Sequence, residues 1–260
     1  MGREIFRRIE KDIKERIKRA KKIIFFLDYD GTLVPIKKKP AFAGLGKDTR
    51  ALLSKLAGST CFSVFIISGR SLRDIKKLIG VKRLYYVGNH GIELEGPRLK
   101  YINRSAKALR IFIQRAYRAL KKKLKIKGVI LENKAYTLSL HYRLVNPDKV
   151  PALKKLFKNT IKGLLRQRKI KVTEGKKVLE VRPNTKWNKG KIVNWILKKA
   201  KTRNVLPIYI GDDKTDEDAF KALGKRGISI LVSKNRRKTF AQYRLNSPKE
   251  VIRFLYEFVD

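Results

Sequence analysis

Short apolar runs separated by longer amphipathic segments are the main pattern along this chain. Three runs carry no charged residue, and each is followed directly by a polar residue or glycine, as buried strands commonly are. Ser71 and Asp74 form a capping box that predicts a helix after the second run. Buried strands that alternate with helices predict a parallel α/β sheet. The runs are IIFFL at 23–27, VFII at 64–67 and LYYV at 84–87.

The pattern changes between residues 98 and 183. After a predicted hairpin around Gly96, helical spacing of apolar residues gives way to segments that alternate between apolar and polar positions. Helices on one face of an antiparallel sheet would produce this mixture, so we expect an inserted α+β domain. The expected elements are a helix at 105–124, strands at 128–133 and 135–143, a helix at 147–169, and strands at 170–173 and 177–182.

The alternation of strand and helix resumes after Pro183. We therefore expect a doubly wound, Rossmann-like parallel sheet built from residues 21–97 and 184–260, with the α+β domain inserted at 98–183. Pro97 and Pro183 mark the two crossings between these domains, where a hinge is a hypothesis. The expected elements of the second half are a helix at 189–201, a strand at 205–210, a helix at 215–223, a strand at 228–232 and a final helix from Pro248.

The first 20 residues predict an amphipathic basic helix. Ile5, Ile9, Ile13 and Ile17 lie four apart with charged residues between them. We expect this apolar stripe to dock onto the body of the protein, with a membrane surface or another chain as the alternative. No apolar run approaches the ~20 residues that cross a bilayer, so we expect no membrane span.

Composition bears on class and compartment. At 260 residues and 43% hydrophobic content, the chain can bury a core, which excludes a disordered polybasic tail. The single cysteine, Cys61, cannot form an internal disulfide, and the first thirty residues lack the apolar segment of a secretion signal. These observations predict a cytoplasmic protein.

The charge of the chain has two interpretations. Sixty-six Lys and Arg residues against 22 Asp and Glu residues give a formal charge of +44. Such an excess favours nonspecific contact with polyanions. The basic clusters are dispersed along the chain and are not interleaved with the aromatic residues that single-strand binders use. We therefore favour a solvated basic surface, with polyanion binding as the alternative.

Acidic residues, which are scarce, concentrate in two segments that follow predicted strands. Ligands of a parallel α/β sheet bind outside the carboxyl ends of its strands. Carboxylates placed this close repel one another unless a cation lies among them, and hard oxygen ligands suit Mg²⁺. Either segment alone could be a turn or an acidic helix N-terminus; together they predict a magnesium site. The residues are Asp28, Asp30, Asp212, Asp213, Asp216, Glu217 and Asp218.

These segments resemble known motifs. DYDGT at 28–32, Ser68 after a strand, Lys189 in NKGK and the later GDDKTDED resemble, in order, the four motifs of the haloacid dehalogenase superfamily of phosphotransferases. Longer matches resemble the trehalose-6-phosphate phosphatase family. They are DYDGTLVPI, SGRS, GNHGIELEG, the ENK and HYR pair of the insert, and EVRPNTKWNKG.

The resemblance implies catalytic roles for four residues. Asp28 would be the nucleophile that forms an aspartyl-phosphate, which divides one difficult hydrolysis into two easier steps. Asp30 would protonate the departing sugar oxygen and then deprotonate the attacking water. Ser68 and Lys189 would hold the phosphoryl oxygens.

The resemblance also implies a metal site and a substrate site. Mg²⁺ would be held by Asp28, the backbone carbonyl of Asp30 and Asp212, with Asp213 and Asp216 as ligands or supports. In that family the insert is a cap that closes over the sugar, although cross-strand ion pairs on an exposed sheet are an equal explanation for its paired charges. The implied substrate contacts are Thr32, Arg70, Asn89 and His90 in the core, and Glu132, Lys134, Arg143, Lys176 and Glu180 in the insert.

We therefore expect a Mg²⁺-dependent phosphomonoesterase that converts trehalose 6-phosphate to trehalose and phosphate. One alternative is a related sugar phosphatase acting on sucrose phosphate or mannosyl-3-phosphoglycerate. A second is a nucleic-acid-binding protein that keeps the fold, which the +44 charge motivates. A trehalose-phosphate synthase that docks on the N-terminal helix is a further hypothesis.

Overall fold

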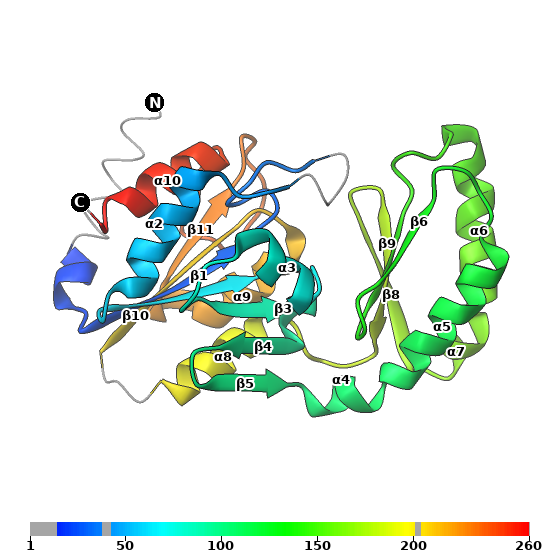
Figure 1. The fold of residues 1–260 in the computed structure, drawn as a ribbon, viewed down its shortest axis with the longest axis horizontal. Coiled ribbons are helices and arrows are strands. Elements are labelled where there is room, and N and C mark those ends of the chain that lie inside the picture. The colour runs from blue at the N-terminus through cyan, green and yellow to red at the C-terminus, as the bar shows by residue number, and fades with distance from the viewer. Residues whose placement is uncertain (1–14, 38–42, 201–203, 260) are drawn as a thin grey trace. The chain divides into compact units, whose positions relative to one another are not determined.

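The computed structural model describes residues 15–37, 43–200 and 204–259. The chain divides into two compact units, which we call the large unit (residues 1–101 and 187–260) and the small unit (residues 102–186). In Figure 1 the chain passes from the large unit to the small unit after β5 and returns before α8.

The large unit is built on one eight-stranded sheet with the strand order β12-β11-β10-β1-β2-β3-β4-β5. Neighbouring strands from β12 to β3 are parallel, and β4 joins β3 antiparallel. This confirms the expected doubly wound parallel sheet. The strands are β1 (Lys22–Asp28), β2 (Phe62–Ile67), β3 (Tyr85–Gly88), β4 (Glu93–Gly96), β5 (Leu99–Ile102), β10 (Val205–Gly211), β11 (Ile228–Val232) and β12 (Tyr243–Leu245).

Helices cover both faces of this sheet. Successive residues of β1 alternate between two separate buried clusters, one containing Phe25 and the other Phe26, which explains why the strand is apolar throughout. On the Phe25 side pack α2 (Lys47–Gly58), α3 (Leu72–Ile79) and α10 (Pro248–Tyr256). On the Phe26 side pack α8 (Lys189–Lys199) and α9 (Glu217–Leu223).

The small unit is a second sheet with helices on one face. Its four antiparallel strands have the order β6-β7-β9-β8. Leu138, Leu140 and Val181 project from this sheet into a buried cluster with residues of the helices α5 and α6. The elements are β6 (Ile130–Asn133), β7 (Leu138–His141), β8 (Ile170–Gly175), β9 (Val178–Pro183), α4 (Arg104–Ala108), α5 (Arg110–Lys123), η3 (Pro147–Lys149), α6 (Val150–Thr160) and α7 (Lys162–Arg166).

The structure differs from the sequence expectation in several elements. The expected insert began at residue 98, but β5 pairs into the large sheet, so the small unit begins at Ile102. The single helix expected at 147–169 is broken, because Ile161 leaves helical geometry with φ −103° and ψ 7° between α6 and α7. The helix α2 and the short edge strand β12 were not predicted, and the helix expected at 215–223 starts with the 3-10 turn η4 (Lys214–Asp216).

Most of the predicted N-terminal helix lies outside the described residues. Residues 15–19 are helical, and the side chain of Ile17 packs against the large unit's core. Arg16 donates from Nη2 to the carbonyl oxygen of Lys225 at 3.4 Å. Over the described ranges, none of the helices combines the length and the apolar character that crossing a bilayer requires.

Candidate active site

Three carboxylates meet where β1 and β10 end. Asp28 is the last residue of β1, while Asp212 and Asp216 follow β10, the strand that pairs with β1 in parallel. Oxygens of all three side chains lie within 4.8 Å of one another, and Asp28 and Asp216 are buried while Asp212 is partly buried. The parallel register thus brings together two acidic segments that are more than 180 residues apart in the sequence.

Lys189 lies among these carboxylates. It is the first residue of α8, whose N-terminus is capped by the side chain of Asn188. The ammonium Nζ donates to Asp28 Oδ1 and to Asp216 Oδ1, both at 2.7 Å, and Lys189 is only 2% exposed. Burial alone would lower the pKa of Lys189, but the charges of Asp216 and Asp28 outweigh it and raise the pKa above its usual value. Among the many lysines of this chain, Lys189 is therefore a buried, charged group at the carboxylate cluster.

Burial has the opposite consequence for Asp28. It raises the pKa of the Asp28 carboxyl well above its usual value, and the nearby carboxylates of Asp216 and Asp212 raise it further, while Lys189 lowers it. Thr32 donates from Oγ1 to Asp28 Oδ2 at 3.4 Å. A buried carboxylate crowded by two others gains stability from any additional cation placed among them.

Asp216 has partners on both oxygens. Besides Lys189, its Oδ1 accepts from the Tyr209 hydroxyl at 2.6 Å, and its Oδ2 accepts from the Asp213 backbone N–H at 2.9 Å. Asp216 therefore orients Lys189 and the loop after β10. Sequence reasoning missed Tyr209, because its hydroxyl reaches the site from inside the apolar strand β10.

The turn after β1 accommodates the Asp212 carboxylate. Gly31 has φ +93°, and a Cβ added there would lie 2.2 Å from Asp212 Oδ2. Only glycine combines this backbone conformation with such a close approach. The DYDGT turn and the GDD segment are therefore packed directly against each other.

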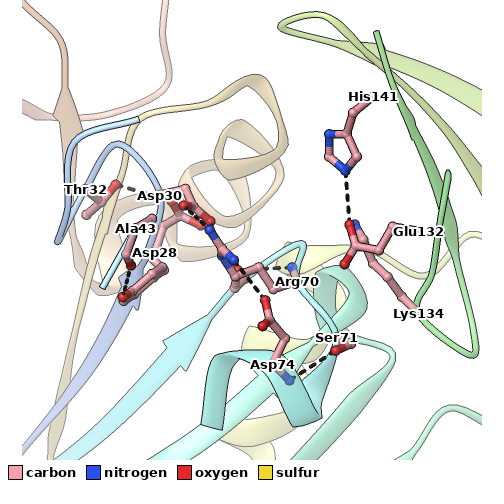
Figure 2. Close-up of polar contacts among 12 residues, drawn as sticks. Asp28, Asp30, Thr32, Ala43, Arg70, Ser71, Asp74, Glu132, Lys134 and His141 are labelled. Atoms are coloured by element: carbon pink, nitrogen blue, oxygen red, sulfur yellow. Dashed lines mark hydrogen bonds and ion pairs between the residues drawn. The ribbon is translucent and has the colours of Figure 1, made fainter. Parts of the chain in front are cut away.

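Asp30, the expected acid and base, is held by Arg70. Both Asp30 oxygens accept from the guanidinium, Oδ2 from Nε at 2.6 Å and Oδ1 from Nη2 at 2.8 Å. Arg70 also donates from Nη1 to Asp74 Oδ2 at 2.8 Å and lies over the ring of Tyr29. Figure 2 shows the Arg70 side chain reaching from one carboxylate to the other. The hydrogen bonds to Asp30 and its charge raise the pKa of Arg70 against the effect of burial.

The loops after β2 and β3 complete this end of the sheet. Ser68 accepts at Oγ from the backbone N–H of Arg70 at 3.1 Å, and its carbonyl accepts from the N–H of His90 at 3.0 Å. The Asn89 side chain donates to Glu93 at 2.5 Å. Asn89 and His90 both adopt left-handed φ values, 50° and 56°, which non-glycine residues rarely do. Hydrogen bonds thus link the predicted residues Ser68, Asn89 and His90 into one set of loops.

The predicted insert residues lie on the strands of the small unit's sheet or in the loops next to them, and two of them pair. Glu132 on β6, Ser139 on β7 and Glu180 on β9 share a row of the antiparallel register, so they lie on the face opposite the helices. Lys134 donates from Nζ to Glu180 Oε1 at 3.1 Å, and both residues are 8% exposed. We call the side of the sheet that carries Glu132, Ser139 and Glu180, together with Lys134, the polar sheet face.

The sequence predicted some of the remaining polar contacts of the small unit and missed others. His141 Nε2 and Glu132 Oε2 are 3.0 Å apart, as Figure 2 shows. The exposed Arg143 donates to the backbone carbonyl of Lys176 at 2.9 Å rather than pairing with a carboxylate. Arg182 lies 4.0 Å from Glu180 and was missed, although its spacing of two from Glu180 on one strand was a signal for a shared face.

Comparison with known proteins identifies the family. Residues 26–249 match the trehalose-phosphatase family. Trehalose-phosphate phosphatase B of Arabidopsis thaliana is 38% identical over 257 residues, which cover 93% of this chain and 67% of that protein. Probable trehalose-phosphate phosphatase 4 of Oryza sativa subsp. japonica is 40% identical over 251 residues, with the same coverage. The chain belongs to the trehalose-phosphatase family.

Solved structures of this family have the same fold. The C-terminal domain of the C. albicans trehalose-6-phosphate phosphatase superposes with a TM-score of 0.81 at 26% identity, covering 96% of each chain. The Aspergillus fumigatus trehalose-6-phosphate phosphatase gives a TM-score of 0.65 at 27% identity, covering 96% of this chain and 97% of that one. The resemblance inferred from the motifs is thus confirmed.

The donor set of this trehalose-phosphatase family member fits a hard divalent cation. Asp28 and Asp212 offer carboxylate oxygens, and Asp216 stands beside them with its own oxygens engaged by Lys189, Tyr209 and the Asp213 N–H. Oxygen ligands with no sulfur or imidazole among them are typical of Mg²⁺ sites. Among the residues that the structure describes, this is the one cluster of at least three such ligand side chains.

Proposed function

We propose that this protein is a Mg²⁺-dependent phosphatase that hydrolyses trehalose 6-phosphate to trehalose and phosphate. The observation that carries the proposal is the cluster of Asp28, Lys189 and Asp212 at the carboxyl edge of the sheet, in a chain that matches the trehalose-phosphatase family along most of its length. The single exposed cysteine, Cys61, suits a reducing compartment, and we place the enzyme in the cytoplasm.

Asp28 is the nucleophile in this proposal. Its carboxylate attacks phosphorus, the new bond from the Asp28 oxygen to phosphorus forms as the bond from phosphorus to the sugar oxygen breaks, and an aspartyl-phosphate results. Water then attacks this phosphoryl group and releases phosphate, which restores the carboxylate. Lys189, held 2.7 Å from Asp28, stabilises the negative charge of the phosphoryl oxygens, and Ser68 and Thr32 donate hydrogen bonds to them.

A bound Mg²⁺ would neutralise the phosphoryl charge beside Asp28 and Asp212. With that charge neutralised, the Asp28 carboxylate could approach the anionic phosphate of the substrate with less repulsion. Gly31 leaves room for the Asp212 carboxylate, since a Cβ at position 31 would lie 2.2 Å from Asp212 Oδ2.

Asp30 moves the proton. It gives a proton to the departing sugar oxygen and takes one from the attacking water. In the structure both Asp30 oxygens accept hydrogen bonds from Arg70, which fixes the position of the Asp30 carboxyl group beside Asp28. In this proposal Arg70 is therefore a positioning residue for Asp30.

The small unit supplies sugar recognition in this proposal. We assign the hydroxyls of the sugar to Glu132, Lys134 and Glu180 on the polar sheet face, and to Arg143 and Lys176 at the ends of its strands. Carboxylates and ammonium groups are suited to hydroxyls because each hydroxyl both donates and accepts. The pairs Lys134–Glu180 and Glu132–His141 keep these groups in place before substrate arrives.

Phosphate release from trehalose 6-phosphate, with Mg²⁺ and with a chelator, tests the proposal. We expect metal-dependent release that exceeds the release from glucose 6-phosphate, sucrose 6-phosphate, mannosyl-3-phosphoglycerate and an aryl phosphate. Equal rates on all the sugar phosphates would contradict the assignment of trehalose 6-phosphate as the substrate. If no phosphate is released from any of these substrates, the proposed phosphatase activity is wrong.

The two aspartates of DYDGT have separable roles, which Asp30→Asn tests with an aryl phosphate. An aryl oxide leaves without a proton, so the first step survives, whereas hydrolysis of the aspartyl-phosphate lacks its base. We expect a burst of aryl oxide close to one equivalent per enzyme, followed by turnover slower by about 10²-fold or more. Asp28→Asn is the control and should give no burst. Full steady turnover by Asp30→Asn would remove Asp30 from the mechanism.

A trehalose-phosphate synthase partner remains a hypothesis for the N-terminal segment. Comparing the mass in solution of the full chain and of a chain without residues 1–20, each mixed with a synthase, tests it. A complex formed equally by both chains would exclude the segment from the contact.

A further inference from the structure

Basic residues that are dispersed in the sequence lie together on the helical side of the small unit. α5 and α6 pack against each other, and α5 packs along the sheet. Figure 1 shows α5, α6 and α7 lying on one side of the small sheet. Nine of the exposed cations of these helices form what we call the helical basic face: Arg115, Arg118, Lys121, Lys122, Lys123, Lys155, Lys158, Lys162 and Arg166.

This face contains no carboxylate of its own. The sequence has no Asp or Glu between Glu95 and Glu132, nor between Asp148 and Glu174. Of the small unit's four acidic residues, Glu132, Glu174 and Glu180 each bond to a basic side chain. The fourth, Asp148, lies in η3, ahead of α6. Glu174 pairs with Lys154 of α6, and the helices themselves add no carboxylate, so most of their positive charge is not balanced on the same surface, unlike the interspersed charges of an ordinary solvated helix.

The outward surface of these helices offers charge rather than an apolar stripe. Ile113 and Leu120 of α5, and Leu153 and Phe157 of α6, are buried toward the sheet. Ile111 is the large hydrophobic residue of these helices that is mostly exposed, at 52%. Helices that bind a membrane surface bury an apolar face in it. A surface with cations alone matches instead a polymer that presents a regular row of phosphates.

The dimensions agree with such a polymer. α5 has 14 residues, so it is about 21 Å long, and one strand of a duplex carries a phosphate about every 3.4 Å. Lys and Arg neutralise phosphates through long, flexible side chains, and this binding releases counterions and needs no base contacts. We propose that the helical basic face binds the phosphate backbone of nucleic acids without sequence preference.

Two six-residue variants test the location of binding. The face variant carries Lys→Gln at Lys121, Lys122, Lys123, Lys155, Lys158 and Lys162. The matched control removes the same charge from exposed helical lysines of the large unit, with Lys→Gln at Lys47, Lys55, Lys77, Lys191, Lys198 and Lys249. Gln keeps good helix propensity, and none of these residues belongs to the proposed active site.

The measurement is fluorescence anisotropy of the full chain with short labelled DNA and RNA duplexes of two sequences, over a series of NaCl concentrations. We expect the wild-type protein to bind all duplexes alike, with affinity falling steeply with salt. The face variant should bind about tenfold more weakly or worse at low salt, and its salt slope should fall by about one for each lost phosphate contact. The control variant should keep the wild-type slope.

Three results would overturn the proposal. Equal losses in the face variant and the control would mean that net charge alone drives binding. Binding to anionic phospholipid vesicles with none to the duplexes would mean that the face is a membrane surface. No binding by the wild-type protein at low salt would mean that the face is only solvated. Unchanged phosphate release by both variants shows that each is folded, and it keeps the outcome separate from that of the proposed phosphatase function.

Discussion

Single residues at the carboxylate cluster act on stability and on chemistry together. Lys189 is the buried cation shared by Asp28 and Asp216. Burying two carboxylates is expensive without a charged partner at hydrogen-bonding distance. Lys189, which holds the phosphoryl oxygens in the proposed mechanism, therefore also offsets the cost of burying Asp28 in the folded protein.

Replacing this lysine tests both roles. We expect Lys189→Met to lose activity and, without added metal, to lower the free energy of unfolding by about 3–5 kcal/mol, because it leaves Asp28 and Asp216 buried with no cation between them. Added Mg²⁺ should restore part of the stability but not the activity. Denaturant unfolding with and without Mg²⁺ measures this. Lys191→Met, an exposed position on the same helix, is the control and should change little.

Gly31 gives a second residue-scale test. Gly31→Ala forces a Cβ onto the Asp212 carboxylate at a left-handed backbone position, so we expect weaker Mg²⁺ binding and lost activity as well as lower stability. Gly80 is the matched control, because it has φ +65° and nothing within 4 Å of an added Cβ. Gly80→Ala should cost about 1 kcal/mol of stability and leave the metal titration unchanged. Equal Mg²⁺ affinity in both variants would show that Asp212 is not a metal ligand.

At this scale the sequence predicts contiguous motifs well and contacts across the sheet poorly. The aspartates of DYDGT and GDDKTDED were found because acidic residues are rare in this chain and follow apolar runs. The hydrogen bond of Tyr209 to Asp216 and the clamp of Arg70 on Asp30 depend on which strand ends are neighbours. That information lies in the register of the sheet, which no local pattern carries.

At the scale of elements, the apolar runs located the central strands because those strands are buried on both faces. β12, with three residues, and β5, with alternating half-buried residues, lie at the two edges of the sheet, where burial is incomplete and the apolar signal fades. The break at Ile161 was invisible because its neighbours continue the helical spacing of apolar residues. The packing of α5 against α6 brings together basic residues about 35 positions apart in the sequence, which no local pattern shows.

The polar sheet face gives the element-scale prediction. If this face binds the sugar, Lys134→Met should raise the KM for trehalose 6-phosphate by about tenfold, because one charged hydrogen bond is lost, while kcat and KM for a small aryl phosphate stay as in the wild type. Lys155→Met, exposed on α6, is the control for the loss of one charge from the small unit. Equal effects on both substrates would mean that Lys134 only stabilises the sheet through Glu180.

At the scale of the whole molecule, the pH dependence of stability at alkaline pH is set by the ionisation of many lysines and of a few buried tyrosine hydroxyls. Tyr86 is one of these phenols: its hydroxyl donates to the carbonyl of Val81 at 2.7 Å and accepts from the N–H of the same residue at 3.1 Å. Burial raises the pKa of Tyr86 above its usual value of 10.0, and the hydrogen bond to Val81 opposes this only in part. A phenolate could not donate to that carbonyl, so the fold requires the neutral form.

The sign of the effect follows from proton binding. Above about pH 10 the unfolded chain releases the Tyr86 proton while the folded protein keeps it, so stability falls as pH rises. The contribution of Tyr86 is complete below that pH and is lost as pH rises through the raised pKa. Lysines titrate in the same range, and their loss of charge relieves the repulsion of a +44 chain, which masks the phenol in the wild-type curve. Tyr86→Phe separates the two, because both proteins carry the same lysines.

We expect Tyr86→Phe to be less stable than the wild-type protein at pH 8, by about 1–3 kcal/mol, because the backbone groups of Val81 lose their partner. This deficit should shrink between pH 9 and about pH 11, since only the wild-type protein loses the phenol's contribution there. Paired denaturant curves at each pH give the difference directly. A deficit that stays constant with pH would mean that Tyr86 ionises as readily in the folded protein as in the unfolded chain. The backbone around Val81 would then open to water without loss of the fold.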